Sequence, residues 1–251
     1  MLRKQSILKR LNNDINLILL NQVDSTNSYA KRDNSNEYPK VVIAKKQTGG
    51  RGRLGRSFVS KKGGLYLSYV TDTLGADFNA GLITACAAVA AAKAIDEVCG
   101  IECGIKWVND IYINNKKVCG ILTEGFFTNN NTLPDKIIIG IGINITRNFA
   151  TKEIKNIATA LNKECKKKID INTLAACIIN NLEDGLKNID KLEFLDGYRN
   201  KSIVVGKEIK IFQNNDCYIA KALRIENDCS LTVMHNGIEK NINFGEISIK
   251  I

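Results

Sequence analysis

The chain has 251 residues, of which 44% are hydrophobic and 25% are charged, and its formal net charge at pH 7 is +10. These fractions are typical of a globular protein and exclude a fibrous or low-complexity chain. The basic balance favours an anionic partner such as a nucleotide, a nucleic acid or an acidic protein.

Short apolar runs bounded by polar residues predict the strands of the first part of the chain. These predicted strands cover residues 16–23, 41–46, 64–70, 103–107, 111–113, 117–127 and 135–145. The last run is apolar throughout, as expected of a central strand that is buried on both faces. After the first strand, Asp24, Ser25 or Thr26 is a candidate N-cap of a helix. The alanine-rich stretch 76–100 predicts the clearest helix, with Gly100 at its C-terminal end.

Further helices are predicted over residues 172–189 and 191–200. From about Lys201 the pattern changes to short β runs separated by polar turns, which is typical of a small β-barrel or sandwich. We therefore expect a mixed α/β domain over residues 1–200 and a small β domain over residues 201–251.

Three compositional features narrow the function classes. No apolar run reaches the length of about 18 residues that a membrane-spanning helix needs, and the basic N-terminal stretch lacks the continuous apolar core of a secretory signal. The eight cysteines include no CxxC pair, and His235 is the only histidine. We expect reduced thiols in a cytoplasmic protein, no zinc site, and no catalytic scheme that needs an imidazole.

The segment QTGGRGRLGRS, residues 47–57, combines four glycines with three arginines. Glycines let backbone N–H groups approach an anion, and arginine donors match carboxylates and phosphates. We call this segment the Gly/Arg segment. It is not a Walker A loop, because no Gly-Lys-Ser/Thr follows. It does not fit a dinucleotide-binding loop either, because arginines stand between its glycines and the residues after it are poor helix formers. A flexible basic surface loop or a nucleic-acid-binding tail is the alternative interpretation.

Three further motifs have both a functional and a structural interpretation. In KWVNDIY, residues 106–112, Lys106 could face a phosphate and Asp110 its Mg²⁺, although an Asn-Asp turn beside a core Trp107 is the alternative. Lys117 opens an apolar strand that contains Gly120. A lysine at the edge of a strand is also a common structural arrangement. The glycines in IIIGIGINI, residues 137–145, indicate that another group approaches this strand, or that it packs tightly against the alanine-rich helix.

The motifs DSTN, QTGGRGRLGRSF, KWVNDIY, KKVCGILTE and IGIGINI follow one another between residues 24 and 144. Their order and spacing closely resemble the biotin–protein ligase family, the biotin–[acetyl-CoA carboxylase] ligases, although that family usually has proline where this chain has Val108. The resemblance implies an α+β fold with a mixed β-sheet and flanking helices, related to class II aminoacyl-tRNA synthetases, and a C-terminal SH3-like β-barrel. Repressor members also carry an N-terminal helix-turn-helix domain. Only 15 residues precede the first predicted strand, which begins at residue 16, and these are too few for three helices, so we expect no repressor function.

The resemblance also implies an activity and a set of residues for it. Family members join biotin to ATP, hold biotinyl-5′-AMP and transfer biotin to a lysine of a carrier domain, such as that of acetyl-CoA carboxylase. The implied catalytic residues are Lys117, Lys106 and Arg53. The implied biotin contacts are Ser25, Thr26, Asn27, Gln47, Gly50, Arg51, Gly52, Arg53, Lys117 and Gly120. The implied nucleotide contacts are Arg51, Arg53, Arg56, Phe58, Lys106, Asn109 and Asn144, with Asp110 as the implied Mg²⁺ ligand.

This activity needs no enzyme nucleophile, because positive groups can bring the biotin carboxylate and the ATP phosphates together. We expect the Gly/Arg segment to act as a lid that is mobile when empty and ordered by the ligand. The expected partners are biotin, ATP with Mg²⁺ and a carrier domain, without nucleic acid or membrane, and a homodimer formed through the sheet edge would suit the family. The alternatives are a nucleic-acid-binding protein, a lipoate–protein ligase and a carrier-docking protein without catalysis.

Overall fold

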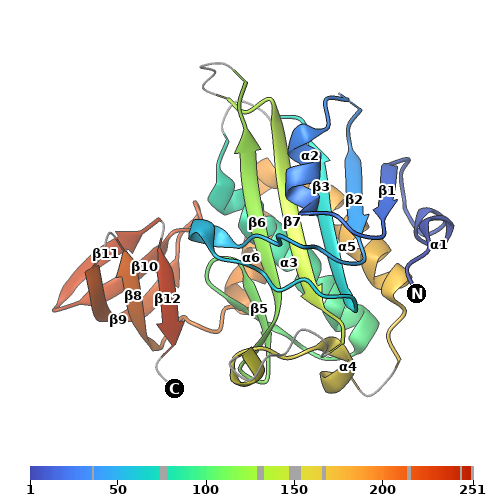
Figure 1. Ribbon diagram of the computed structural model, residues 1–251. Helices are drawn as coiled ribbons and strands as arrows, with labels where there is room; N and C mark the ends of the chain where they lie inside the picture. Colours follow the sequence, from blue (N-terminus) through green and yellow to red (C-terminus); the bar gives the residue numbers. More distant parts are fainter. Residues whose placement is uncertain are drawn as a thin grey trace.

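The computed structural model describes residues 1–35, 37–73, 78–128, 133–146, 154–165, 168–213, 216–243 and 245–249. Its main body is built on a seven-stranded sheet with the order β1-β2-β3-β7-β6-β5-β4 (Figure 1). In chain order its strands are β1 (Asn16–Leu20), β2 (Lys40–Ala44), β3 (Gly64–Thr71), β4 (Gly104–Lys106), β5 (Asp110–Ile113), β6 (Lys116–Phe126) and β7 (Lys136–Asn144). β1 and β2 are parallel, and the other neighbouring strands are antiparallel. The sheet is therefore mixed, and β7 lies at its centre, as its unbroken apolar pattern predicted.

Helices cover both faces of this sheet (Figure 1). They are α1 (Lys4–Leu8), α2 (Thr26–Arg32), α3 (Ala80–Cys99), α4 (Leu161–Glu164), α5 (Ile171–Lys187) and α6 (Phe194–Asn200). α3 packs against α5, α6 and the sheet, while α2 lies on the opposite face, where Ala30 packs on Val70 and Ile138. The side of the sheet that α3 leaves open is therefore shared by α2 and the loops that follow it.

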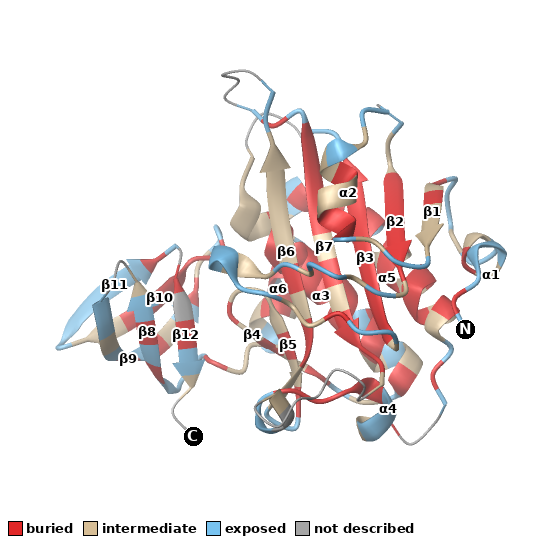
Figure 2. Cartoon of the chain, viewed as in Figure 1, coloured by how far each residue is buried: buried red, intermediate tan, exposed pale blue. Residues whose placement is uncertain are grey.

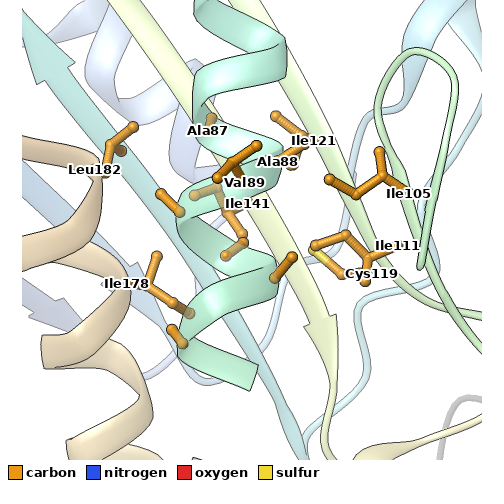
Figure 3. Close-up of a cluster of buried hydrophobic side chains, with 14 of the residues drawn as sticks. Ala87, Ala88, Val89, Ile105, Ile111, Cys119, Ile121, Ile141, Ile178 and Leu182 are labelled. Atoms are coloured by element: carbon orange, nitrogen blue, oxygen red, sulfur yellow. The ribbon is translucent and has the colours of Figure 1, made fainter. Parts of the chain in front are cut away.

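α3 is the helix that the alanine-rich stretch predicted. The side chain of Asn79 caps its first turn by accepting hydrogen bonds from the N–H groups of Gly81 and Leu82, at 2.9 and 3.1 Å. Gly100 ends it in the left-handed conformation, with φ 67°. Ala87 and Ala88 lie between Ile121 of β6 and Ile178 of α5 (Figure 3), because a methyl side chain lets the helix approach both neighbours closely.

A second, antiparallel sheet contains the β runs predicted after Lys201. Its strands have the order β11-β10-β9-β8-β12. Their bounds are β8 (Glu208–Gln213), β9 (Asp216–Ile225), β10 (Leu231–His235), β11 (Ile238–Ile242) and β12 (Glu246–Ile249). Exposed and buried residues alternate along β8, whereas β2 and β3 of the main sheet are buried throughout (Figure 2). The mixed sheet with its helices and this smaller sheet confirm the predicted fold class, while the domain boundary at residue 200 stays a prediction.

The second sheet is joined to the β4–β5 end of the main sheet. The indole N–H of Trp107 donates to the carbonyl of Cys229 at 2.9 Å, and Ile105 pairs with the chain at Ser202. The guanidinium of Arg199 donates to the carbonyl of Ile225 at 3.0 Å. These contacts place the second sheet beside the KWVNDIY turn.

The sequence analysis did not predict α1. This helix is only five residues long, and a single buried side chain, Ile7, fixes it on the main body, so no periodic pattern marks it. Among the described helices, none combines the length and apolarity that crossing a bilayer requires.

Candidate active site

A cavity of about 330 Å³ lies on the α2 face of the main sheet. Predicted site residues that line it are Ser25, Thr26, Asn27, Gln47, Arg51, Gly52, Arg53, Arg56, Phe58, Lys106, Asn109, Asp110, Lys117 and Gly120. Trp107, Tyr66, Leu122, Ile157 and Ile247 are among the lining residues that were not predicted. The fold thus brings together motifs that lie far apart in the sequence: Ser25 of DSTN and Gly142 of IGIGINI, 117 positions apart, line the same cavity.

The Gly/Arg segment forms a narrow hairpin over this cavity and crosses in front of β6 and β7 (Figure 1). The N–H of Phe58 donates to the carbonyl of Gly50 at 2.9 Å, and the N–H of Gly52 donates to the carbonyl of Arg56 at 2.7 Å. At its tip Leu54 and Gly55 have φ values of 52° and 74°, the left-handed region that favours glycine. The side chain of Leu54 is 76% exposed.

Glycines of the sheet make room for two side chains of the opposite wall. A Cβ atom added to Gly142 would lie 2.7 Å from the Phe58 ring, and one added to Gly140 would lie 2.4 Å from Asn27 Oδ1. The alternating residues Ile139 and Ile141 instead face the main core with α3. The groups that approach the central strand are therefore Asn27 and Phe58, and the alternative of packing against the alanine-rich helix is wrong.

One end of the cavity is polar and uncharged. Ser25 is the N-cap of α2, with its Oγ accepting from the Ser28 N–H at 3.4 Å. Oε1 of Gln47 accepts from the backbone N–H and the hydroxyl of Thr26, at 2.8 and 3.1 Å. Nε2 of Gln47 donates to Ser60 Oγ at 2.8 Å, which fixes the orientation of the amide. The pocket-facing groups of Ser25, Thr26 and Gln47 are thus held in place before any ligand arrives.

Asn27 is held from two sides beside this polar end. Its Oδ1 accepts from Ser68 Oγ at 2.6 Å, and its Nδ2 donates to Glu124 Oε2 at 2.8 Å. Because these bonds engage both ends of the amide, Asn27 shapes the wall more than it offers free donors.

Glu124 joins α2, β6 and the Gly/Arg segment, and the sequence analysis did not predict a role for it. Besides Asn27, its carboxylate contacts Lys31 Nζ at 2.6 Å and Arg51 Nη1 at 4.0 Å. Burial alone would raise the pKa of Glu124, but the hydrogen bonds from Lys31 and Asn27 outweigh burial and hold the pKa below its ordinary value. A charged residue ending the apolar run KKVCGILTE was the signal that could have indicated it.

The other end of the cavity carries cationic side chains. Nζ of Lys117 lies 2.6 Å from Asp110 Oδ1 and 5.8 Å from the centre of the Phe58 ring. Nζ of Lys106 lies 5.7 Å from the centre of the Tyr112 ring. Lys117 and Asp110 therefore form an ion pair inside the cavity. An incoming anion could therefore exchange with Asp110 at the Lys117 ammonium.

Arg53 connects the Gly/Arg segment to both sheets. Its guanidinium donates to Asn109 Oδ1 at 3.3 Å and to the carbonyl of Gly245 at 3.2 Å. Asn109 in turn donates from Nδ2 to the carbonyl of Ile121 at 2.8 Å. The second sheet contributes to the cavity wall through Ile247 of β12, which no local sequence pattern indicated.

Two predicted ligand contacts lie outside the cavity lining described here. Gly50 lies beneath the hairpin, where an added Cβ would be 2.3 Å from the Phe58 carbonyl oxygen. Asn144 is buried at the end of β7, paired with Gly64 of β3. Their contacts with a ligand stay predictions.

The KWVNDIY turn has an unusual backbone. The peptide bond between Trp107 and Val108 is cis, at the position where the resembled family usually has proline. The hydroxyl of Tyr198 donates to the carbonyl of Val108 at 2.9 Å. Within the described residues, no cluster of three or more His, Cys, Asp or Glu side chains is suited to a metal ion.

Comparisons with known proteins agree on one family. Residues 19–144 match the family model described as "Biotin/lipoate A/B protein ligase family". The bifunctional ligase/repressor BirA of Bacillus subtilis (strain 168) is 33% identical over 235 residues, which cover 89% of this chain and 71% of that protein. A biotin–[acetyl-CoA-carboxylase] ligase of Mycobacterium tuberculosis is 27% identical over 179 residues, 68% of this chain and 64% of that protein.

Among solved structures, the biotin protein ligase of Aquifex aeolicus in complex with biotin and ATP has the same fold. Its TM-score is 0.82 at 30% sequence identity, and the match covers 94% of this chain and 98% of that chain. The likeness therefore includes the second sheet as well as the main one.

Proposed function

Because the chain belongs to the biotin/lipoate A/B protein ligase family, we propose that it activates biotin with ATP to biotinyl-5′-AMP and transfers the biotinyl group to a lysine of a carrier protein. The observation that carries this proposal is the two-ended cavity. Its neutral hydrogen-bonding end, at Thr26 and Gln47, suits an uncharged ureido ring, and its cationic end, at Lys117 and Lys106, suits a carboxylate and phosphates.

The glycine-lined floor between the two ends supports the same ligand. Gly120 lines the cavity with Gly140 and Gly142, and the Phe58 ring and Leu122 add apolar surface. An aliphatic chain fits such a wall, because it can replace water there without leaving polar groups unpaired. The proposed biotin contacts are the residues predicted from the sequence, with Asn27 acting mainly by shaping the wall.

The first proposed step is an attack of the biotin carboxylate on the α-phosphorus of ATP. A carboxylate oxygen–phosphorus bond forms, the bond to the β-phosphate oxygen breaks, and pyrophosphate leaves. Both reactants are anions, so the step depends on neutralisation and positioning by Lys117, Lys106 and Arg53. In the second step the amine of the carrier lysine attacks the acyl carbon, an amide bond forms and AMP leaves.

Asp110 is the proposed Mg²⁺ ligand. A single carboxylate beside a phosphate site fits Mg²⁺, which usually keeps waters and phosphate oxygens in its shell. Bound there, Mg²⁺ would neutralise phosphate charge, and Lys117 would be free to face the biotin carboxylate.

We propose that the Gly/Arg segment covers the intermediate. Its hairpin lies over the cavity, and Arg53 holds it to Asn109 and to the second sheet. A cover of this kind excludes water from a reactive mixed anhydride.

The proposed acceptor is the biotin carrier domain of a carboxylase, as the names of the Mycobacterium and related ligases suggest. We propose ligation alone for these 251 residues, with no DNA-binding role. A cytoplasmic location and pairing of two copies stay predictions.

The test is to incubate the protein with biotin, MgATP and a biotin carrier domain, and to measure the intact mass of the carrier. We expect the carrier to gain one biotinyl group, only when ATP is present and only when its acceptor lysine is intact. Lipoate replaces biotin in a parallel reaction. A carrier of unchanged mass, or one that gains a lipoyl group instead, would contradict the proposed function.

A further inference from the structure

A buried lysine holds the C-terminal end of α2, the helix whose first turn forms the polar end of the cavity. Lys136 is the first residue of β7 and is 5% exposed. Its Nζ donates to three backbone carbonyls, those of Ala30 at 2.8 Å, Lys31 at 3.1 Å and Asp33 at 2.7 Å. An ammonium group has three donors, so the end of α2 occupies all of them.

These carbonyls need a partner because of where α2 ends. The helix stops at Arg32, and Asp33 turns into an extended conformation with ψ 114°. The carbonyls of Ala30 and Lys31 therefore have no N–H group one turn further on. Lys136 supplies the missing donors from a neighbouring strand, and it brings a positive charge to the negative end of the helix dipole.

The surroundings compensate for burying this charge. Nζ of Lys136 lies 4.8 Å from the centre of the Phe126 ring, a cation–π contact. Burial lowers the pKa of Lys136, while the nearby Asp33 acts in the opposite direction. Lys40, 2% exposed, contacts the Asp33 carboxylate and the Ser35 hydroxyl, which fixes the residues that follow the helix.

The N-terminal end of the same helix holds the pocket groups. Thr26 is bonded to Gln47, and Asn27 to Ser68 and Glu124. Four residues of a helix span about 6 Å, so a tilt of the last turn moves the first turn directly. Nothing flexible separates the anchor at Ala30 from the pocket groups at Thr26 and Asn27, because all three belong to one continuous helix.

We propose that Lys136 is a positioning residue for the biotin end of the cavity: it fixes the last turn of α2 and thereby sets the places of Ser25, Thr26 and Asn27. This inference rests on the proposed function, because the ligand at that end is taken to be biotin. It adds a residue that is absent from the cavity lining given above and that touches no substrate.

The test is the variant Lys136→Met, which keeps an unbranched chain beside Phe126 and removes the three donors. If the competent arrangement of α2 falls to about a tenth of the molecules, the apparent Kd for biotin rises about tenfold. The Kd for ATP should stay within about twofold, because ATP is expected at the opposite end. Calorimetric titration of the folded variant with each ligand measures both values.

The matched control is Lys201→Met. The side chain of Lys201 is 17% exposed and pairs with Asp96 of α3, whereas α2 packs mainly on β2, β3 and β7. This control should leave the Kd for biotin unchanged. If Lys136→Met does not fold, Lys136→Gln is used in its place. Its amide restores two donors without the charge, so we expect a smaller rise of the Kd for biotin.

Hydrogen exchange of the ligand-free proteins tests the anchor by itself. The amides of α2 should exchange faster in the Lys136 variants than in Lys201→Met. A parent protein that binds no biotin refutes the proposed function and this inference together. If the parent binds biotin but a Lys136 variant binds it equally well, the role of Lys136 alone is overturned. The same holds if the variant loses affinity for biotin and for ATP to the same extent.

Discussion

Replacing Gly140 by alanine should damage the biotin end of the cavity through a single methyl group. The added Cβ would lie 2.4 Å from Asn27 Oδ1 and 3.0 Å from Asn27 Cγ. Asn27 cannot turn aside without losing its hydrogen bonds to Ser68 and Glu124. If Asn27 turns aside, the lost neutral hydrogen bond costs about 1 kcal/mol and the lost bond to the carboxylate about 1.5–3 kcal/mol. If Asn27 keeps both bonds, the overpacking costs about 1–3 kcal/mol instead.

We therefore expect Gly140→Ala to lower the free energy of unfolding by about 2–4 kcal/mol, or the Tm by about 4–16 °C in a chain of this size. The Kd for biotin should rise by about tenfold or more, because the displaced Asn27 enters the space of the ligand. Thermal unfolding and calorimetric titration with biotin measure the two effects.

The matched control is Gly49→Ala in the nearby Gly/Arg segment. There an added Cβ would meet only the Asp24 carbonyl oxygen, at 3.6 Å, an ordinary contact. This variant should keep the parent Tm and biotin affinity. If Gly140→Ala also kept both parent values, the packing of Asn27 on β7 would not determine the shape of the pocket.

Three further changes test other parts of the site. Lys117→Met removes the cation beside Asp110 and should slow biotin-dependent pyrophosphate exchange by about 100-fold or more while the protein stays folded; exchange at the parent rate would refute the role of Lys117. Trp107→Phe leaves the Cys229 carbonyl without its indole donor and should lower the free energy of unfolding by about 1–3 kcal/mol in denaturant titrations, and an unchanged midpoint would show that this link between the sheets contributes nothing. The pKa of Glu124 in the folded protein is below its ordinary value. The carboxylate therefore stabilises the protein at pH values above that ordinary pKa, and this stabilisation is lost as the pH falls through the folded pKa. Glu124→Gln should therefore flatten the fall of Tm in acid below about pH 4.5, and equal slopes for parent and variant would count against the Lys31–Glu124 contact.

Much of the main sheet could be predicted because its strands are short, apolar and bounded by polar residues. The central place of β7 followed from its lack of any polar face, and the C-terminal end of α3 followed from Gly100. The helix begins at Ala80, after the Asn79 cap, and not at residue 76 as predicted. α1 was missed because one buried side chain, Ile7, is not a periodic pattern.

The site divides along similar lines. The Gly/Arg segment was singled out because glycines and arginines stand close together in the sequence, whereas a role for Lys117 was implied only by the family resemblance; both line the cavity. Glu124 was missed because its partners, Asn27 and Lys31, are more than 90 positions away. The backbone carbonyl of Gly245 carries no side-chain signal at all, so its hydrogen bond from Arg53 of the Gly/Arg segment could only be found in the folded structure.

The orientation of the strand glycines was also left open by the sequence. A glycine in a strand indicates close approach but not from which face. Only the pairing of β7 with β3 and β6 fixes Gly140 and Gly142 on the α2 side, opposite Ile139 and Ile141.

The central claim is that the Gly/Arg segment closes over a biotin–nucleotide intermediate and retains it. Native mass spectrometry of the protein incubated with biotin and MgATP, without a carrier, tests this most directly. We expect the parent protein to carry one bound biotinyl-5′-AMP, and Arg53→Gly, which removes the contacts to Asn109 and Gly245, to release most of it. A folded parent protein without the adduct, or an Arg53→Gly variant that retains it equally well, would contradict the claim.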